Sequence, residues 1–160
     1  MEMQTEPVPL CVTCGVCCTD AFFRFSTVTP EESARLHALG FPIETENGRE
    51  IFTHACTQLR GAACNVYEAR PATCRKFFCT TLTALGDGAI DRAEADRRVT
   101  ILKAAVRRVR EHLAQGERIW EFRTRIYADP EDSPQARLAL VSLDMLADRY
   151  FKPRDRRFLS

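Results

Sequence analysis

The sequence predicts a helix-rich α+β fold, in which an irregular, metal-stapled N-terminal region with short strands packs on C-terminal helices. Three observations carry this prediction. All eight cysteines lie between Cys11 and Cys79, the strand-like segments near them are short, and amphipathic helical patterns dominate the rest. The length of 160 residues suits one compact domain. We therefore expect a single domain with a cysteine-cluster region at 11–79 and a helical region at 90–151.

A strand and a helix are expected directly after the first cysteines. The aromatic and β-branched residues of 21–29 predict a short strand. Thr29 then suits a helix N-cap, Pro30 suits the first helical position, and Glu32 completes a capping box. Gly40 supplies the stop signal of this helix.

The next elements are expected to lead the chain back toward the first cysteines. Asn47 and Gly48 predict the turn of a β-hairpin between two short strands. This hairpin would bring Cys56 near the first cysteine group. Residues 71–79 begin with proline and predict a short helix.

The last part of the chain predicts helices. A long helix should begin near Asp91, because its apolar residues recur in steps of three and four. They are Ala95, Val99, Leu102, Val106, Val109 and Leu113. Residues 118–127 fit a strand or a helix equally well, and 133–151 predict a final helix capped by Ser133 or Asp132.

Charge and targeting signals narrow the class of protein. The net charge of +1 gives no strong field that would attract nucleic acid or a membrane. The first ten residues lack the basic start and apolar run of a signal peptide, and no stretch is apolar enough to span a bilayer. We therefore expect a cytoplasmic protein, in a compartment that keeps thiols reduced.

The cysteines are the candidate functional residues. The full set is Cys11, Cys14, Cys17, Cys18, Cys56, Cys64, Cys74 and Cys79. Four disulfides would need an oxidising compartment, and a thioredoxin-like site would need a βαβ context without further cysteines beside it. Burial as small apolar residues explains one or two cysteines, but not four within the octapeptide CVTCGVCC.

Metal ligation explains the cluster better. Two residues between cysteines let the chain curl so that both sulfurs face one point, at the reach of metal–sulfur bonds of ~2.3 Å. The CxxCxxC run is also typical of iron–sulfur clusters, where a distant cysteine completes the set. All-cysteine zinc sites are common too. The expected cofactor is an iron–sulfur cluster or Zn²⁺, and the CxxCxxC run favours iron–sulfur.

The adjacent Cys17 and Cys18 indicate more than one metal ion. Neighbouring side chains point in different directions in both strands and helices, so the two are poorly placed to share one mononuclear ion. Eight thiolates also equal two complete four-sulfur sets. We therefore expect two metal centres or one polynuclear centre.

Basic residues near the second cysteine group could offset the thiolate charge. They are Arg60, Arg70, Arg75 and Lys76. Cys74 is expected in the first turn of its short helix, where the helix dipole would favour a thiolate.

Two segments together resemble a known family. CVTCGVCC, followed by CTQLRGAACNVYEARPATCRKFFC, resembles the CxxCxxCC cysteine-cluster family of zinc- or iron-chelating proteins. The first segment includes Gly15. The residues of the second segment that fit the family pattern are Cys56, Cys64, Tyr67, Arg70, Pro71, Cys74, Arg75, Phe77 and Cys79. The resemblance covers residues 11 to 79 and implies metal binding through these cysteines.

A similar segment occurs in flagellin lysine N-methylases, where it is associated with an iron–sulfur cluster. An alternative function is therefore that of an accessory or remnant of such a protein-modifying enzyme, working with a protein partner. This chain shows no glycine-rich loop for S-adenosylmethionine and has 7 glycines in total. We expect metal ions as its ligands and no catalytic activity of its own.

The remaining candidates have simpler explanations. His54 lies two residues before Cys56, and we expect it beside the metal ligands or at the surface. His37 and His112 fall on predicted helices as ordinary residues of amphipathic faces. The arginines of the long helix are interrupted by acidic residues and lack an aromatic platform, so we expect a solvated face and no nucleic-acid binding.

Overall fold

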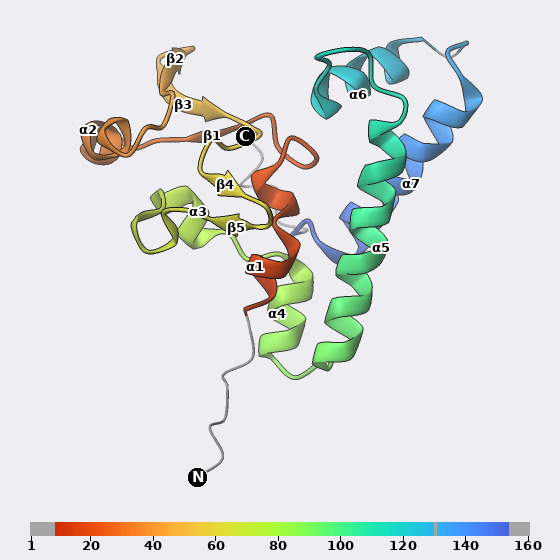
Figure 1. Ribbon diagram of the computed structural model, residues 1–160, viewed down its shortest axis with the longest axis horizontal. Coiled ribbons are helices and arrows are strands. Elements are labelled where there is room, and N and C mark those ends of the chain that lie inside the picture. The colour runs from red at the N-terminus through yellow and green to blue at the C-terminus, as the bar shows by residue number, and fades with distance from the viewer. Residues whose placement is uncertain (1–8, 130, 154–160) are drawn as a thin grey trace.

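The computed structural model describes residues 9–129 and 131–153 and shows a helix-rich α+β protein, as the sequence predicts. Figure 1 shows the strands and the cysteine-bearing elements on one side and the long helices on the other. The helices and 3₁₀ turns are α1 Leu10–Cys14, η1 Val16–Cys18, α2 Pro30–Ala38, η2 Tyr67–Ala69, α3 Ala72–Lys76, α4 Thr80–Gly86, α5 Arg92–Arg110, α6 Ile119–Ala128 and α7 Pro134–Tyr150. Within the described ranges, none of these helices is long and apolar enough to cross a membrane.

The strands form two small antiparallel sheets. They are β1 Phe25–Thr27, β2 Glu44–Glu46, β3 Arg49–Thr53, β4 Leu59–Arg60 and β5 Ala63–Cys64. The first sheet has the order β1-β3-β2, and β4 pairs with β5 in a separate hairpin. Asn47 and Gly48 join β2 to β3 with φ angles of 50° and 75°, as a tight hairpin turn requires. The predicted hairpin is confirmed.

The first strand is much shorter than the predicted 21–29. β1 pairs only over three residues, from Phe25 opposite Thr53 to Thr27 opposite Ile51. Ala21 is fully buried in the core instead, and its carbonyl accepts a hydrogen bond of 3.0 Å from Arg123. Packing against α6 therefore takes this segment out of the sheet, which local strand propensity cannot reveal.

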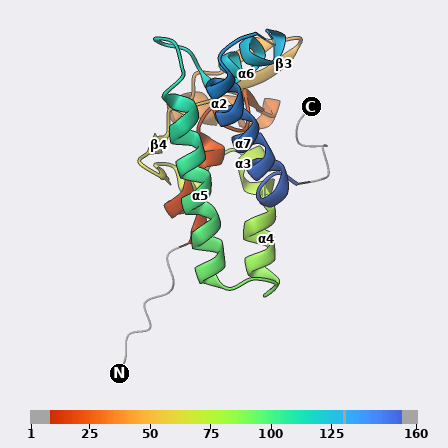
Figure 2. The ribbon, with the colours of Figure 1, turned by 90° about the vertical axis from the view of Figure 1, so that its right-hand side faces the viewer.

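The long helices follow their sequence signals. The Thr29–Glu32 capping box opens α2, and Asp91 caps α5 by accepting a hydrogen bond of 2.8 Å from the Glu94 amide. Ser133, rather than Asp132, caps α7. Figure 2 shows α5 and α7 side by side, with α4 beside the lower part of α5.

The undecided segment 118–127 is a helix. In α6, Ile119, Phe122 and Ile126 are all fully buried, and their spacing of three and four residues brings them to one face. A strand would have pointed Ile119 and Phe122 to opposite faces.

One helix was not predicted. Residues 71–79 were expected to form a single short helix, but α3 ends at Lys76 and a new helix, α4, begins at Thr80. Thr81 is fully buried in α4 and donates its hydroxyl to the Tyr150 carbonyl. The Thr80 amide also donates to the Phe151 carbonyl at 3.0 Å. Docking against the end of α7 therefore supports a threonine-rich helix that its own propensity does not favour.

The buried apolar residues form two clusters. The larger lies among α5, α6, α7 and the first cysteine run, and the smaller among α2, β3 and the loops near them. The smaller consists of Val28, Leu36, Phe41 and Phe52. The larger consists of Leu10, Val16, Ala21, Phe22, Ala95, Val99, Leu102, Ala105, Val106, Val109, Ile119, Phe122, Ile126, Ala136, Leu140, Leu143, Ala147 and Phe151.

A buried carboxylate ties the N-terminal region to the helices. Asp20 accepts hydrogen bonds of 2.7 Å from the Arg110 guanidinium and 2.8 Å from the Ile119 amide, the first residue of α6. Arg118 donates at 2.6 Å to the carbonyl of His54. These contacts join segments about 60 to 100 residues apart in the chain. The cysteine-bearing region therefore packs on the C-terminal helices, as the sequence predicts.

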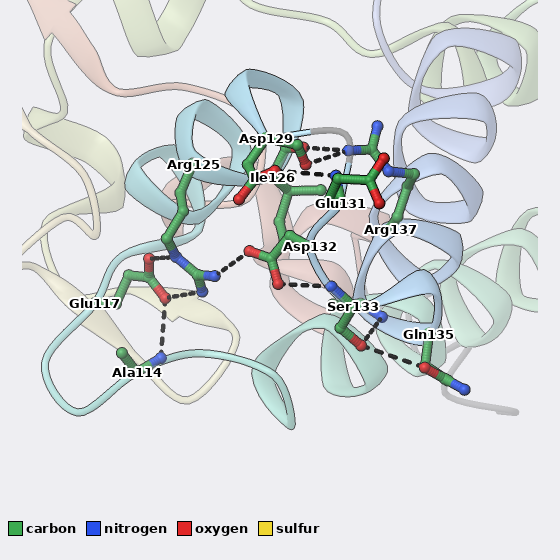
Figure 3. Close-up of polar contacts among 11 residues, drawn as sticks. Ala114, Glu117, Arg125, Ile126, Asp129, Glu131, Asp132, Ser133, Gln135 and Arg137 are labelled. Atoms are coloured by element: carbon green, nitrogen blue, oxygen red, sulfur yellow. Dashed lines mark hydrogen bonds and ion pairs between the residues drawn. The ribbon is translucent and has the colours of Figure 1, made fainter.

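The connection between α6 and α7 is held by polar contacts (Figure 3). Arg125 donates to Glu117 at 2.8 Å on one side and to Asp132 at 2.7 Å on the other. Arg137 donates at 2.7 Å to the carbonyl of Ile126 near the end of α6. These contacts link both ends of α6 to the start of α7.

Candidate metal centre

The eight cysteines, although up to 68 residues apart in the chain, line one cavity of about 300 Å³. All are free thiols, and each is partly exposed. The other walls are largely aromatic, with Phe23, Phe52 and Phe77 among them. The structure therefore brings together all the residues that the sequence predicts as metal ligands.

The first cysteine run is shaped by a short helix and a glycine. Cys11 and Cys14 are three residues apart on α1, and such residues lie on the same face of a helix. Gly15 ends the helix with a φ of 65° and donates its amide to the Cys11 carbonyl at 3.0 Å. Its α-carbon faces the β4–β5 turn so closely that a Cβ would lie 2.7 Å from the Ala62 oxygen. Only glycine meets both conditions here.

The adjacent cysteines lie in the next turn. Cys17 and Cys18 are in η1, where successive side chains are about 120° apart because a 3₁₀ turn has three residues. The Cys18 carbonyl accepts a hydrogen bond of 2.8 Å from the Cys56 amide. The predicted return of Cys56 to the first cysteine group is confirmed.

The later cysteines are held by three separate elements. Cys64 lies in β5, paired with Leu59 of β4. Cys74 lies in the five-residue helix α3. Cys79 caps the unpredicted helix α4, where its sulfur accepts a hydrogen bond of 3.4 Å from the Leu82 amide.

A buried glutamate supports the helix that carries Cys74. Glu32, 8% exposed, accepts hydrogen bonds from the Thr29 amide at 3.2 Å and from the Ala72 amide, the first residue of α3, at 3.0 Å. Burial opposes its ionisation, but these hydrogen bonds outweigh burial and hold the pKa of Glu32 below its usual value. The capping box was visible in the sequence. The hydrogen bond from the Ala72 amide could not be predicted, because it joins residues 40 positions apart.

Comparison with protein families identifies the cysteine-bearing part of the chain. The model of the CxxCxxCC family, described as a "putative zinc- or iron-chelating domain", matches residues 10–100. The chain belongs to this family. No curated protein and no solved structure matches it.

The CxxCxxCC match contains all eight cysteines and ends within α5. It leaves α6 and α7 outside, although both build the core on which the cysteine region packs. The family description supports binding of zinc or iron.

Burial keeps most of the thiols of this CxxCxxCC protein protonated. It raises the pKa of Cys74 to about 12 and that of Cys79 to about 11, and it raises those of Cys11, Cys14 and Cys56. The sequence-based expectation that the helix dipole favours a Cys74 thiolate is therefore wrong. In a five-residue helix, desolvation and neighbouring thiolate charges outweigh the dipole.

Cys18 is the exception among the thiols. The hydrogen bond from Cys17 lowers the pKa of Cys18, and the charge of Arg70 lowers it further against the effect of burial. The same hydrogen bond, together with burial, raises the pKa of Cys17. The pKa of Cys18 is therefore lowered, whereas those of Cys11, Cys14, Cys17, Cys56, Cys74 and Cys79 are raised.

Two basic residues act directly on the thiols. Arg70 stacks 3.8 Å from the centre of the Tyr67 ring, and its charge opposes the rise of the Cys11 pKa that burial causes. Lys103 of α5 acts in the same way on Cys14 and donates at 3.1 Å to the Thr13 carbonyl. Lys103 was missed because it lies outside the cysteine-rich segments.

The other basic candidates have different roles. Arg60 donates at 2.8 Å to the Thr57 carbonyl. Arg75 donates at 2.8 Å to the carbonyl of Arg70 and so helps to hold the backbone there. Lys76 is exposed. The sequence alone could not separate Arg70 from these neighbours.

His54 is buried in the wall of the cavity, with 3% of its surface exposed, so of its two expected positions the structure shows the one beside the cysteines. Its ring contacts the Ser26 hydroxyl at 2.8 Å and the Cys18 carbonyl at 3.3 Å. Burial lowers the pKa of His54 and favours the neutral ring. It thus lies beside the cysteines as a support of the backbone at Cys18.

The cysteines converge on the cavity without forming a closed coordination sphere. Among residues 9–129 and 131–153, no three His, Cys, Asp or Glu side chains are arranged so that they could hold a metal ion as they stand. A cysteine sulfur moves between staggered positions by rotation of one bond, so ligation would require these side chains to rotate toward a common point. The donor chemistry fits, because soft thiolates are the preferred ligands of zinc and of iron–sulfur clusters.

Proposed function

We propose that this protein binds zinc or iron through its eight cysteine thiolates and that this binding is its main biochemical property. One observation carries the proposal: all eight thiols line a single cavity, although they come from six separate elements or loops. Chance burial of small residues would not bring all of them to one wall. The family match supports the same chemistry.

The energetics of the thiols also support a bound cation. Metal ligation requires deprotonated cysteines, and a bound metal ion deprotonates the thiols that coordinate it. Burial raises the pKa of six of the cysteines here, and the charge of a cation inside the cavity would offset the cost of their ionisation. When bound, the metal would supply a structural cross-link among the cysteine-bearing elements and, if it is iron–sulfur, an electron-transfer centre.

Of the two metals, we favour iron–sulfur. The CxxCxxC spacing of Cys11, Cys14 and Cys17 with a distant fourth cysteine is the arrangement typical of such clusters. Four-cysteine zinc sites use the same ligands, so the experiment must separate the two.

Elemental analysis and a visible absorbance spectrum of anaerobically purified protein test this proposal. An iron–sulfur protein is coloured and bleaches reversibly with dithionite, whereas Zn²⁺ is d¹⁰ and colourless. The control is a Met145→Ala variant, because Met145 is exposed on α7 and lies outside the matched segment. It should bind as much metal as the wild type. A folded wild-type protein that contains and takes up neither metal would refute the proposal.

A further inference from the structure

We propose that the eight cysteines form two separate four-sulfur sites, divided between the neighbours Cys17 and Cys18. The helix set contains Cys11, Cys14, Cys17 and Cys79. The hairpin set contains Cys18, Cys56, Cys64 and Cys74. This division rests on the proposed metal binding and adds to it an assignment of each ligand.

The two hydrophobic clusters separate the cysteines in this way. Cys14, Cys17 and Cys79 pack against the larger cluster, on the side of α5 and α7. Cys56 and Cys74 pack against the smaller cluster, beneath α2 and β3. The two groups are thus held by different parts of the core.

The helix set is built from α1 and the start of α4. Cys11 and Cys14 share one face of α1, which packs on α5, and α4 packs on α5 as well. Cys79 precedes α4 directly and packs against the larger cluster together with Cys14.

Cys17 belongs with the same group. It packs against the larger cluster together with Cys14 and Cys79.

The hairpin set is built around the turn that begins at Cys56. The Leu59 amide donates at 3.2 Å to the Cys56 carbonyl, and Leu59 pairs with Cys64 across the β4–β5 hairpin. The hydrogen bond from the Cys56 amide to the Cys18 carbonyl adds Cys18 to this group.

Cys74 joins the hairpin set from α3. It packs against the smaller cluster together with Cys56. Its partners in the proposed set are Cys18, Cys56 and Cys64.

The two sets meet at Cys17 and Cys18. The two residues are adjacent in η1, and all eight cysteines line the same cavity. The two sites are therefore neighbours within one cavity. Lys103 of α5 donates to the Thr13 carbonyl beside Cys14 of the helix set, and Arg70 lines the cavity that holds both sets.

Paired alanine variants test the division. The double variants Cys17→Ala/Cys79→Ala and Cys18→Ala/Cys79→Ala differ only in which of two adjacent cysteines is removed. The first damages one set, so it should keep half of the wild-type metal content after equilibration with a mild chelator. The second damages both sets and should keep none. Circular dichroism checks that each variant keeps the helix content of the wild type, most of which comes from the long helices such as α5 and α7.

The reciprocal pair places the hairpin set under the same test. Cys18→Ala/Cys64→Ala should keep half of the metal, and Cys17→Ala/Cys64→Ala should keep none. If Cys18→Ala/Cys79→Ala kept half of the metal and Cys17→Ala/Cys79→Ala kept none, the division would be overturned.

Cadmium NMR on the wild-type protein tests the division even if the alanine variants lose all metal or fail to fold. The full-length protein is loaded with an NMR-active cadmium isotope, which replaces zinc at thiolate sites. Two cadmium signals are expected, each correlated with the β-protons of one set of four cysteines. A cysteine correlated with both ions would show a single polynuclear centre and overturn the proposal. A wild-type protein that binds neither cadmium, zinc nor iron would instead refute metal binding itself.

Discussion

The α-carbon of Gly15 lies against the carbonyl of Ala62, so that a Cβ at position 15 would be 2.7 Å from that oxygen. This contact joins the first cysteine run to the β4–β5 hairpin that carries Cys64. The position of the CxxCxxCC segment beside this hairpin therefore depends on a residue that is not itself a candidate metal ligand.

Replacing Gly15 by alanine should weaken both the fold and the metal site. The φ of 65° and the contact with Ala62 together predict a loss of about 3 kcal/mol in the free energy of unfolding. The matched control is Gly61→Ala, where φ is 60° and nothing lies within 4 Å of the new Cβ. It should cost about 1 kcal/mol and keep its metal content. Equal losses in the two variants would contradict this prediction.

Glu32 should stabilise the protein only when it is ionised. Replacement by glutamine weakens the hydrogen bond from the Ala72 amide and should lower the free energy of unfolding by about 2 kcal/mol at neutral pH. The control is Glu31→Gln, an exposed neighbour on the same helix, with an effect within about 0.5 kcal/mol. Chemical denaturation of both variants checks this.

The effect of Glu32 has a defined pH dependence. Its pKa is lower in the folded protein than in the unfolded chain. Its contribution is therefore complete above the unfolded pKa of about 4.3 and is lost as the pH falls through the lower folded value. The difference in stability between wild type and Glu32→Gln should shrink on acidification below about pH 4. A difference that stays constant to lower pH would show that Glu32 does not act through its charge.

Arg70 should strengthen metal binding by stabilising thiolates. It opposes the rise of the Cys11 pKa caused by burial and lowers the pKa of Cys18. Arg70→Gln should weaken metal affinity by about tenfold, as changes beside metal ligands commonly do. Arg60→Gln is the control, because Arg60 bonds to the Thr57 carbonyl instead. Competition with a chelator measures both, and the loss in Arg70→Gln should be larger at lower pH.

Removal of the metal should loosen the cysteine region before the helices. Binding free energy at a structural site is part of the folding free energy, so a chelator should speed hydrogen exchange within 11–79 first. The amides of α5 and α7 serve as the internal reference, because their shared core contains no cysteine ligand in its buried set. Unchanged exchange in 11–79 after confirmed metal loss would count against a structural role for the metal.

Much of the secondary structure could be predicted because its signals are local. The Thr29–Glu32 capping box, the Asn47–Gly48 turn and the apolar periodicity of α5 each act over a few residues. The identities of the candidate ligands were equally visible, because CxxCxxCC spacing alone brings several thiols within reach of one another.

Other features depend on contacts between distant segments. Helix α4 is stabilised by the end of α7, and β1 is shortened because Ala21 packs against α6. Residues 118–127 form a helix because Ile119, Phe122 and Ile126 then lie on one buried face. The residue pattern within each of these segments does not predict its secondary structure, because that structure depends on the distant segment against which it packs.

The sequence by itself determined that this is a helix-rich α+β protein of the CxxCxxCC family, with eight cysteines as candidate metal ligands. The tertiary structure decided which basic and acidic residues support that set, with Arg70, Lys103 and Glu32 selected from many charged candidates. It also provides the basis for dividing the cysteines between two parts of the core. The reason is physical: residue type sets what a side chain can bind, but burial and proximity, which arise only on folding, set which groups it meets.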